Sequence, residues 1–425
     1  MNGAVRRSAP RRVVVTGMGA VTALGGDLPR TWARLVAGES GIRPIASFDP
    51  SRVESRIAGE ALEADPARVL DRKALRRTDR ATQLSLLATQ EALADAALPE
   101  HLEGALADAT GAFIGTGFGG AATIFDEIRT YVERGPDRLS PFFVPMAIAN
   151  MTAGQIGIVF GARGPNMATV SACASGAQAI GEGAETIRRG DADVMLVGGT
   201  EATVLEGIVG GFAAMKALST RNDDPAAASR PFDRGRDGFV MGEGAATLVL
   251  EALDHARSRG ARILAEVVGY GASADAYHLT LPVPGSGGAV RAARRAFEKA
   301  GIAADDVDLV SAHATSTPEG DRAELAGLRE LFGARRDAVP ITAIKSALGH
   351  TLGAAGAIAA AVTVRALVDG CVPPTLNLVD PDPEAEGLDL VRGKAREGTF
   401  EVALVNAFGF GGQNSVLVLR RWVDA

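Results

Sequence analysis

VSACASG at residues 170–176 and IKSALGH at residues 344–350 are two versions of one local pattern. In each, a short apolar run with strand character ends in a turn of small residues, and a stretch with helical periodicity follows. The repetition indicates two similar halves, residues 1–255 and 256–425. No linker rich in proline, glycine and serine separates them, so we expect the halves to pack as one body.

Along the rest of the chain, short β-branched runs alternate with longer alanine-rich stretches, which is the pattern of a layered α/β fold. We expect strands at residues 12–15, 112–114, 192–197, 247–250, 263–268, 307–312, 341–345, 400–405 and 415–419, and helices at 28–38, 81–97, 287–300, 321–332 and 354–368. The first strand is expected to stop at Gly17, and Asp321 and Glu324 stand at capping-box spacing. Residues 124–164 have no counterpart in the second half and are expected to be an inserted excursion that could form an interface.

Composition and charge narrow the class of protein. Of 425 residues, 47% are hydrophobic and 22% charged, as in ordinary globular proteins. The net charge of −7 argues against nucleic-acid binding, which usually needs a basic surface. With only Cys173 and Cys371, and no CxxC pair, we expect neither a disulfide framework nor a cysteine-based zinc site. Gly17 and Gly19 begin a dinucleotide fingerprint, but Thr22 occupies its third glycine position, so a nucleotide site is not expected.

The sequence also bears on membranes and compartments. No apolar run approaches the ~18 residues that a membrane span needs. Residues 1–12 carry four arginines but lead only into Val13, Val14 and Val15, which is too short for the core of a signal peptide. We therefore expect a cytoplasmic protein with a large core and no membrane insertion.

Cys173 is the first candidate for chemistry. It stands between a predicted strand and a predicted helix, and its neighbours Ala172, Ala174 and Ser175 are small enough for a tight turn. A thiol at a helix N-terminus lies beside unpaired amides and the positive end of the helix dipole, which lowers its pKa and favours the thiolate. A small, buried structural cysteine is the alternative.

Two histidines accompany Cys173 as candidates. The chain has only five: His101, His255, His278, His313 and His350. We expect His101 and His255 at the surface and His278 in a structural hydrogen bond. His313 and His350 each lie at, or just beyond, the end of a predicted strand, where open α/β sheets bind their ligands. Either could be a satisfied core histidine, but a thiol and two imidazoles at strand ends together indicate a reactive site.

Three further features have both a structural and a functional interpretation. Lys345, at the end of a predicted strand, is either an edge charge or a buried ion partner of the site. The FGFGG turn at residues 408–412 is either an ordinary turn or a source of backbone N–H groups for an oxyanion. A basic helix face, either solvated or docking an acidic partner, is predicted from Arg72, Lys73, Arg76, Arg77 and Arg80.

These segments together resemble the β-ketoacyl-[acyl-carrier-protein] synthases, most closely the synthase II type, over nearly the whole chain. The motifs that carry the resemblance are RVVVTG at 12–17, SACASG at 171–176, LSTRN at 218–222, SRPFD at 229–233, DGFVMGEG at 237–244, AHATSTP at 312–318, KSALGHTLGAAG at 345–356 and FGFGG at 408–412. The resemblance implies a thiolase-like fold of five layers, α-β-α-β-α, with two pseudo-symmetric halves, usually as a homodimer.

The resemblance also implies an acyltransferase that elongates fatty acids by decarboxylative Claisen condensation. Cys173 would carry the acyl chain as a thioester, and malonyl-[acyl-carrier-protein] would lose CO₂ and attack it, giving a 3-oxoacyl chain two carbons longer. His313 and His350 would hold the enolate oxygen, and the N–H groups of Cys173 and Phe410 the tetrahedral oxyanion. Lys345 would support the electrostatics. No metal or cofactor is implied, because the carrier protein brings the pantetheine arm.

Other roles follow from the resemblance residue by residue. Thr315 and Thr317 would bind the pantetheine arm. Phe410 would gate an acyl pocket lined by Phe118 and Phe212, and Glu324 would belong to a structural polar network. The carrier protein would dock on Lys73, Arg76, Arg77, Arg138 and Lys216.

The chain departs from common family patterns at a few positions: Ala314 where glycine is frequent, Ser311 for asparagine, Gln413 for threonine or histidine, and Phe118 for a smaller isoleucine. The bulk of Phe118 predicts a shorter or reshaped acyl pocket. Alternatives are a ketosynthase of a specialised polyketide pathway and a non-catalytic chain-length-factor-like subunit. The intact Cys173, His313 and His350 argue against the second.

Overall fold

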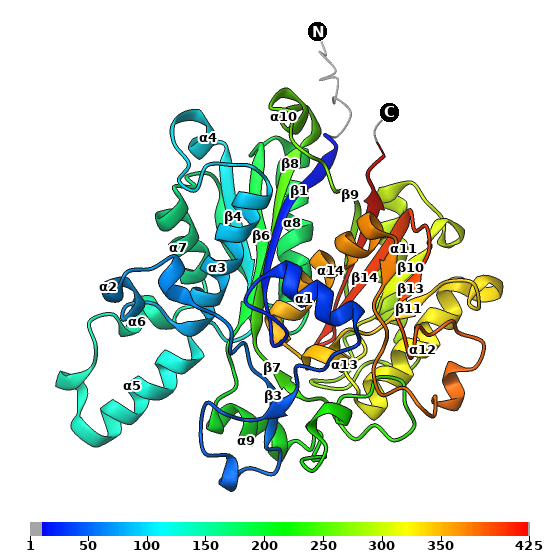
Figure 1. Cartoon of the computed structure of the whole chain (residues 1–425), viewed down its shortest axis with the longest axis horizontal. Coiled ribbons are helices and arrows are strands. Elements are labelled where there is room, and N and C mark those ends of the chain that lie inside the picture. The colour runs from blue at the N-terminus through cyan, green and yellow to red at the C-terminus, as the bar shows by residue number, and fades with distance from the viewer. Residues whose placement is uncertain (1–10, 424–425) are drawn as a thin grey trace.

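The largest sheet within residues 11–423 has ten strands. In spatial order they are β11 (Ile341–Thr342), β10 (Leu309–Ser311), β14 (Val402–Gly409), β15 (Gln413–Arg421), β9 (Ala265–Ala274), β1 (Val13–Val21), β8 (Gly244–Ala252), β6 (Val194–Glu201), β4 (Thr110–Gly115) and β5 (Asn166–Thr169) (Figure 1). Two smaller sheets comprise β2 (Arg43–Pro44), β3 (Ile57–Gly59) and β7 (Met241–Gly242), and β12 (Cys371–Val372) and β13 (Arg396–Glu397). This computed structural model describes residues 11–423. Residues 1–10, with most of the basic N-terminal segment, and 424–425 lie outside the described residues.

A narrow seam crosses the large sheet between β1 and β9. These strands share two residue pairs, Val14 with Glu266 and Val15 with Ala265, whereas β1 pairs with β8 along almost its whole length. The seam separates five strands from residues 13–252 from five strands from residues 265–421. The domain boundary near residue 255 stays a prediction.

Helices cover and separate the two groups of strands, giving the five layers of the thiolase-like fold. In the middle layer, α8 (Ser175–Arg189) and α14 (Ala355–Asp369) pack on strands of both groups. The outer layers are α3 (Arg80–Asp95) with α7 (Met151–Phe160) on one side, and α11 (Gly287–Ala300) with α12 (Pro318–Phe332) on the other (Figure 1).

Small residues let the middle helices lie between two sheets. A Cβ on Gly181 of α8 would lie 2.3 Å from the Tyr270 ring, and one on Gly356 of α14 would lie 2.7 Å from the backbone N of Ala177. The stretch Leu352–Asp369 is long and apolar enough to cross a membrane by length and composition, a stretch that the sequence analysis passed over. Because 83% of this window is buried inside the protein, its hydropathy is that of a core helix.

Three local predictions are wrong. β1 does not end at Gly17 but continues to Val21. The glycine does not break the strand; it allows α3 to pack closely, because a Cβ at Gly17 would lie 2.4 Å from Ala92 O. The strand predicted at 341–345 ends at Thr342, and Lys345 begins a one-turn helix, α13 (Lys345–Leu348). Asp321 is not the N-cap of a helix, because α12 begins at Pro318 and its N-cap is Thr317.

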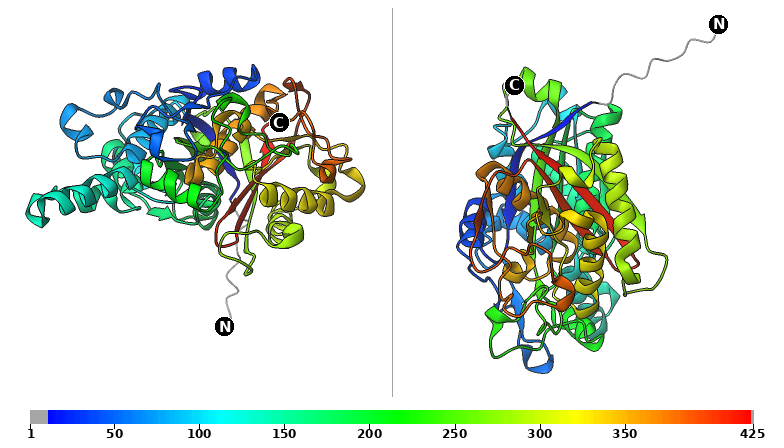
Figure 2. Two further views of the ribbon diagram at one scale, coloured as in Figure 1. Left: turned by 90° about the horizontal axis from the view of Figure 1, so that it is seen from below. Right: turned by 90° about the vertical axis from the view of Figure 1, so that its right-hand side faces the viewer.

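The remaining helices are α1 (Leu28–Val36), α2 (Arg72–Leu75), α4 (Gly104–Asp108), α5 (Ala121–Arg134), α6 (Phe143–Ala147), α9 (Glu206–Ala214) and α10 (Leu253–Ser258). The segment 124–164, predicted as an excursion, contains most of α5, all of α6 and α7. Of these helices, α5 reaches away from the body of the molecule (Figure 1, Figure 2).

Candidate active site

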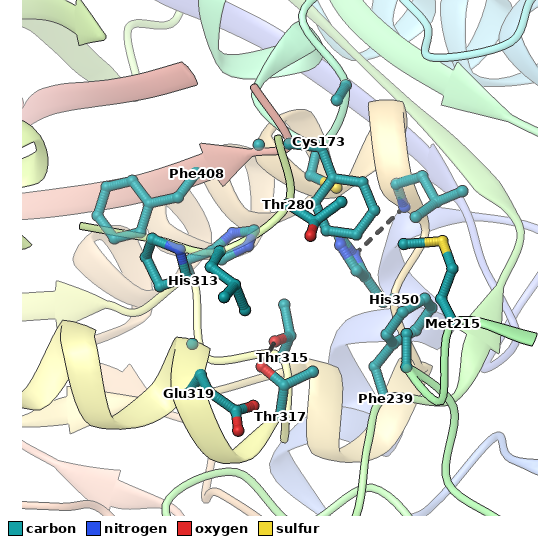
Figure 3. Close-up of a pocket in the computed structure, with 18 of the residues that line it drawn as sticks. Cys173, Met215, Phe239, Thr280, His313, Thr315, Thr317, Glu319, His350 and Phe408 are labelled. Atoms are coloured by element: carbon teal, nitrogen blue, oxygen red, sulfur yellow. Dashed lines mark hydrogen bonds between the residues drawn. The ribbon is translucent and has the colours of Figure 1, made fainter. Parts of the chain in front are cut away.

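One cavity of about 390 Å³ brings the three reactive candidates together. Cys173 enters it from the turn before α8, His313 from the segment after β10, and His350 from the segment between α13 and the 3₁₀ turn Leu352–Ala354 (Figure 3). The convergence has a topological cause: α8 and α14 begin at the same edge of the layered sheets, so the preceding loops meet there.

The Cys173 turn is fixed by its own backbone and by Ser175. Ala172 adopts a left-handed conformation (φ +50°), and the Ser175 hydroxyl donates to Ala172 O at 2.7 Å while accepting from Ser171 N–H at 2.9 Å. The backbone N–H groups of Cys173 and Phe410 both face the sulfur. The turn therefore holds the thiol beside two amides at the N-terminus of α8.

Burial dominates the protonation of this thiol. Desolvation raises the pKa of Cys173 to about 12, although Lys345 and the two N–H groups act in the opposite direction. The sequence-based expectation of a lowered pKa is therefore wrong, because the cost of desolvating a thiolate exceeds the stabilisation from the helix N-terminus.

His350 is a neutral ring of defined tautomer. Burial, and then the nearby Lys345, lower its pKa well below the ordinary value. The Leu352 N–H donates to Nδ1 at 3.3 Å (Figure 3), so Nδ1 is the acceptor and the proton resides on Nε2. Phe239 packs edge-on against the ring, with centroids 5.4 Å apart.

His313 packs against His350 and is also neutral. The two ring centroids are 5.5 Å apart with planes at 85°, and Phe408 lies 5.4 Å from His313. Burial, Lys345 and His350 lower the pKa of His313 well below its ordinary value. Its Nδ1 is buried without a hydrogen-bond partner among the described residues.

Glu324 and Lys345 hold the backbone around His313. Glu324 accepts from the N–H groups of His313 at 2.8 Å and Ala314 at 2.7 Å, and from Asn406 Nδ2 at 3.0 Å. Lys345 Nζ donates to His313 O at 2.5 Å. Because Lys345 is buried and contacts a backbone carbonyl of the site, it is not an edge charge. Burial lowers its pKa to about 8, even though Glu324 favours the charged form.

The residues predicted to contact substrate also line this cavity. They are Thr315, Thr317, Phe118, Phe212 and Phe410. The Thr315 and Thr317 hydroxyls lie 3.0 Å apart, and the Phe212 and Phe410 rings have centroids 6.2 Å apart. Phe118 and Phe410 are 45% and 36% exposed, so the aromatic wall faces open space.

The predicted basic helix face is only partly present. The helix α2 ends at Leu75, so the arginines share no single helix, and Arg80 lies in α3, where it pairs with the buried Glu243 (Nη2 to Oε1, 2.5 Å). Lys73, Arg76 and Arg77 are exposed, with Arg77 over the Phe142 ring at 4.3 Å.

The two more distant docking candidates are exposed as well. Lys216 lies on the cavity wall and pairs with Glu54 at 2.9 Å, and Arg138 ends a 3₁₀ turn after α5.

The other histidines and the second cysteine lie apart from the site. His101 is exposed, as expected, whereas His255 is half-buried, with its Nδ1 2.6 Å from Glu251. His278 accepts from the N–H groups of Thr280 and Leu281 at 3.1 Å, as a structural histidine does. Cys371 lies in β12.

Two polar residues beside the site were not predicted from the sequence: Asn406, which donates to Glu324, and Glu201, which accepts from the Gly117 and Gly353 N–H groups. Asn406 lies within β14, and Glu201 ends β6. Each is the one amide or carboxylate side chain in its strand, VALVNAFG and VMLVGGTE, and this was the available signal. The sequence gives no comparable signal for the Leu352 N–H, because a backbone donor does not depend on the type of side chain.

Comparison with known proteins gives one consistent result. Residues 10–256 match the family described as Beta-ketoacyl synthase, N-terminal domain, and residues 264–379 match Beta-ketoacyl synthase, C-terminal domain. The chain is 44% identical over 414 residues to 3-oxoacyl-[acyl-carrier-protein] synthase 2 of Coxiella burnetii, which spans 97% of this chain and 99% of that protein.

Solved structures agree over the same length. A beta-ketoacyl synthase from Burkholderia phymatum has a TM-score of 0.89 at 37% identity, over 97% of this chain and all of that one. A type II PKS ketosynthase, solved in complex with its acyl-carrier protein and bound to the hexaketide, has a TM-score of 0.89 at 32% identity, over 98% of this chain and all of that one.

Proposed function

The chain belongs to the β-ketoacyl synthase family, and from that premise we propose that it is an acyltransferase of the 3-oxoacyl-[acyl-carrier-protein] synthase II type. It condenses malonyl-[acyl-carrier-protein] with an acyl chain held on Cys173 and so elongates fatty acids by two carbons. The observation that carries the assignment is the convergence of Cys173, His313 and His350 on one cavity.

The first half-reaction is acyl transfer. The Cys173 sulfur attacks the thioester carbon of an acyl carrier protein, the bond from that carbon to the carrier's sulfur breaks, and the thiol proton ends on the departing carrier thiol. The tetrahedral intermediate bears a negative oxygen. The N–H groups of Cys173 and Phe410, which already face the sulfur, are placed to stabilise it.

The second half-reaction forms the carbon–carbon bond. Malonyl carrier protein loses CO₂, and the resulting enolate carbon attacks the thioester on Cys173. The acyl carbon–sulfur bond breaks, and the sulfur of Cys173 takes up one proton. His350 carries its proton on Nε2. Both imidazole rings are neutral and are held by packing and backbone contacts, so they would donate hydrogen bonds to the enolate oxygen.

The partner in both half-reactions is an acyl carrier protein. Its pantetheine arm would run past Thr315 and Thr317, so the reaction requires no resident metal or redox cofactor. The exposed basic residues Lys73, Arg76 and Arg77, together with Arg138 and Lys216, would attract the acidic carrier.

We also propose a homodimer in the cytoplasm. Large apolar side chains are exposed along α5 to α7 and β5: Phe125, Ile128, Tyr131, Val132, Val144, Ile148, Ile158, Met167 and Val170. A patch of this kind is unusual on a monomer. β5 is an edge strand of the large sheet, so a second copy could cover both the patch and the edge.

A second candidate function is chain extension in a specialised polyketide pathway. It is favoured by the likeness to the type II PKS ketosynthase, which differs in substrate and not in fold. A chain-length-factor-like role is disfavoured by the intact Cys173, His313 and His350.

The test is mass spectrometry of Cys173 after incubation with acyl carrier proteins of graded chain length, followed by malonyl carrier protein. We expect an acyl adduct on Cys173 that disappears as a 3-oxoacyl product two carbons longer forms. An adduct on another residue, or no elongation of any chain, would remove the assignment. The identity of the preferred acyl chain distinguishes fatty-acid elongation from chain extension in a polyketide pathway.

A further inference from the structure

Glu201 is a fully buried carboxylate beside the cavity. It ends β6, has no exposed surface, and among the described residues forms no ion pair with a lysine, arginine or histidine. A lone buried charge is costly unless hydrogen bonds satisfy it.

Four donors surround the Glu201 carboxylate. Oε2 accepts from the backbone N–H groups of Gly117 at 2.7 Å and Gly353 at 2.9 Å. Oε1 accepts from the Thr116 hydroxyl at 3.0 Å and the Phe118 N–H at 3.1 Å. Three of the four donors are backbone groups, so the carboxylate fixes main chain and not merely side chains.

Two glycines make room for it. A Cβ on Gly117 would lie 2.8 Å from Glu201 Oε2, and a Cβ on Gly353 would lie 2.6 Å from the same oxygen. No other residue type fits at either position without displacing the carboxylate. The two loops and the acidic side chain therefore form a single close-packed unit.

The two loops serve different parts of the site. Residues 116–118 belong to the first half of the chain and carry Phe118 on the cavity wall. Residues 352–354 belong to the second half, and the Leu352 N–H fixes Nδ1 of His350. Through Gly353, the neighbour of Leu352, one carboxylate sets the spacing between the acyl-pocket wall and the imidazole.

We propose that Glu201 is a positioning residue for condensation, tying the pocket wall at Phe118 to the orientation and tautomer of His350. The proposal rests on the proposed function. It predicts that loosening this tie slows condensation more than acylation of Cys173, because His350 acts on the malonyl enolate in the second half-reaction. It also predicts a broader range of accepted chain lengths, since Phe118 loses its backbone anchor.

Glu201→Gln tests this in the full-length protein. The amide keeps the size of the side chain but turns one acceptor into a donor that faces backbone N–H groups. We expect the condensation rate of acyl-enzyme to fall about 10- to 100-fold, as for a small misplacement of a reacting group, with acylation changed several-fold less. Nitrogen NMR of labelled His350 should show a smaller fraction of the Nε2–H tautomer.

Glu91→Gln is the matched control. Glu91 in α3 is a half-buried carboxylate that likewise accepts backbone N–H groups, from Ala20 at 3.0 Å and Leu28 at 2.9 Å, and desolvation raises its pKa to about 7, as it does for Glu201. It does not line the cavity. The control should lose thermal stability but keep the wild-type ratio of the two half-reaction rates, chain preference and His350 tautomer.

The proposal is overturned if Glu201→Gln behaves like Glu91→Gln, with both half-reactions, the chain range and the tautomer unchanged. If Glu201→Gln does not fold, Glu201→Asp is tested instead, since it keeps the charge but is too short to reach both loops. We again expect condensation to slow more than acylation, but by a smaller factor. A wild-type ratio in that variant also overturns it. Failure of wild-type protein to condense any substrate would instead refute the proposed function.

Discussion

The imidazole rings of His313 and His350 meet edge to face, with centroids 5.5 Å apart and planes inclined at 85°. His350 is buried, His313 is half-buried, and both rings are neutral. Phe239 and the Leu352 N–H contact His350, whereas Phe408 packs against His313. Two neutral donors can serve an oxygen that becomes negative only during the reaction, without a permanent positive charge in the pocket.

His313→Ala and His350→Ala should each slow condensation by about 10²- to 10³-fold, the usual cost of one oxyanion donor. Acylation of Cys173 should fall much less, because we propose that its oxyanion is stabilised by the backbone N–H groups of Cys173 and Phe410. Single-turnover assays of each half-reaction measure this, with His101→Ala, at an exposed histidine outside the cavity wall, as control. Equal losses of rate in acylation and condensation would contradict the proposal that the two histidines act mainly in condensation.

The pKa of Lys345 predicts that the acylation rate falls at alkaline pH. Its pKa is about 8, so its ammonium form prevails below pH 8 and is lost as the pH rises through that value. Since the ammonium group lowers the pKa of Cys173, acylation should decline above about pH 8. Lys345→Met should be slower below pH 8 and lack this limb, whereas the exposed Lys394→Met should retain it. An unchanged pH profile in Lys345→Met would be inconsistent with this role.

Phe118 should limit the acyl chain. It lines the cavity, and its replacement by the smaller isoleucine in Phe118→Ile enlarges the pocket. We expect the preferred acyl carrier protein to shift to longer chains, measured by competition between chain lengths. Tyr277→Ile, an exposed aromatic residue outside the cavity wall, serves as the control. Identical preferences in Phe118→Ile and wild-type protein would show that Phe118 does not set chain length.

Glu251 should stabilise the fold at neutral pH. Burial opposes its charge, but Arg259, His255 and Thr16 bind it and lower its pKa to about 2 from an ordinary 4.5. The stabilisation is therefore complete above pH 4.5 and is lost as the pH falls toward 2, and it amounts to about 3 kcal/mol.

Urea unfolding of Glu251→Gln measures that contribution. The variant should be about 3 kcal/mol less stable than wild-type protein at pH 7, and the gap should narrow as the pH falls below 4.5. Glu103→Gln, an exposed control, should show no gap. A gap that is constant with pH would mean that the carboxylate charge is not the source.

Charge reversal tests the docking surface. Arg76→Glu should raise the KM for acyl carrier protein several-fold, and the effect should shrink as salt rises, because exposed charges are screened over a Debye length of about 10 Å at 0.1 M. The kcat should change little. Arg163→Glu, at an exposed arginine paired with Asp108, is the control. Equal KM changes in both variants would place the docking surface elsewhere.

Much of the fold and of the site could be predicted from the sequence because both depend on local patterns. Cys173, His313 and His350 each follow an apolar run and a break, and strand ends on one edge meet in space. The alternation of strands and helices likewise predicted a layered α/β fold.

What failed depends on tertiary contacts. The course of β1 through Gly17 depends on how closely α3 approaches, and the raised pKa of Cys173 depends on burial that the helix N-terminus does not offset. The role of Glu201 requires two loops from different halves of the chain to be seen side by side. None of these has a signature within one short window of residues.

The position of β1 in the sheet has a consequence for folding. β1 is fully buried near the centre of the sheet, yet its two neighbours, β8 and β9, begin only at Gly244 and Ala265. Each of its strand pairings therefore joins residues that are far apart in the chain, and non-local pairings of this kind form slowly.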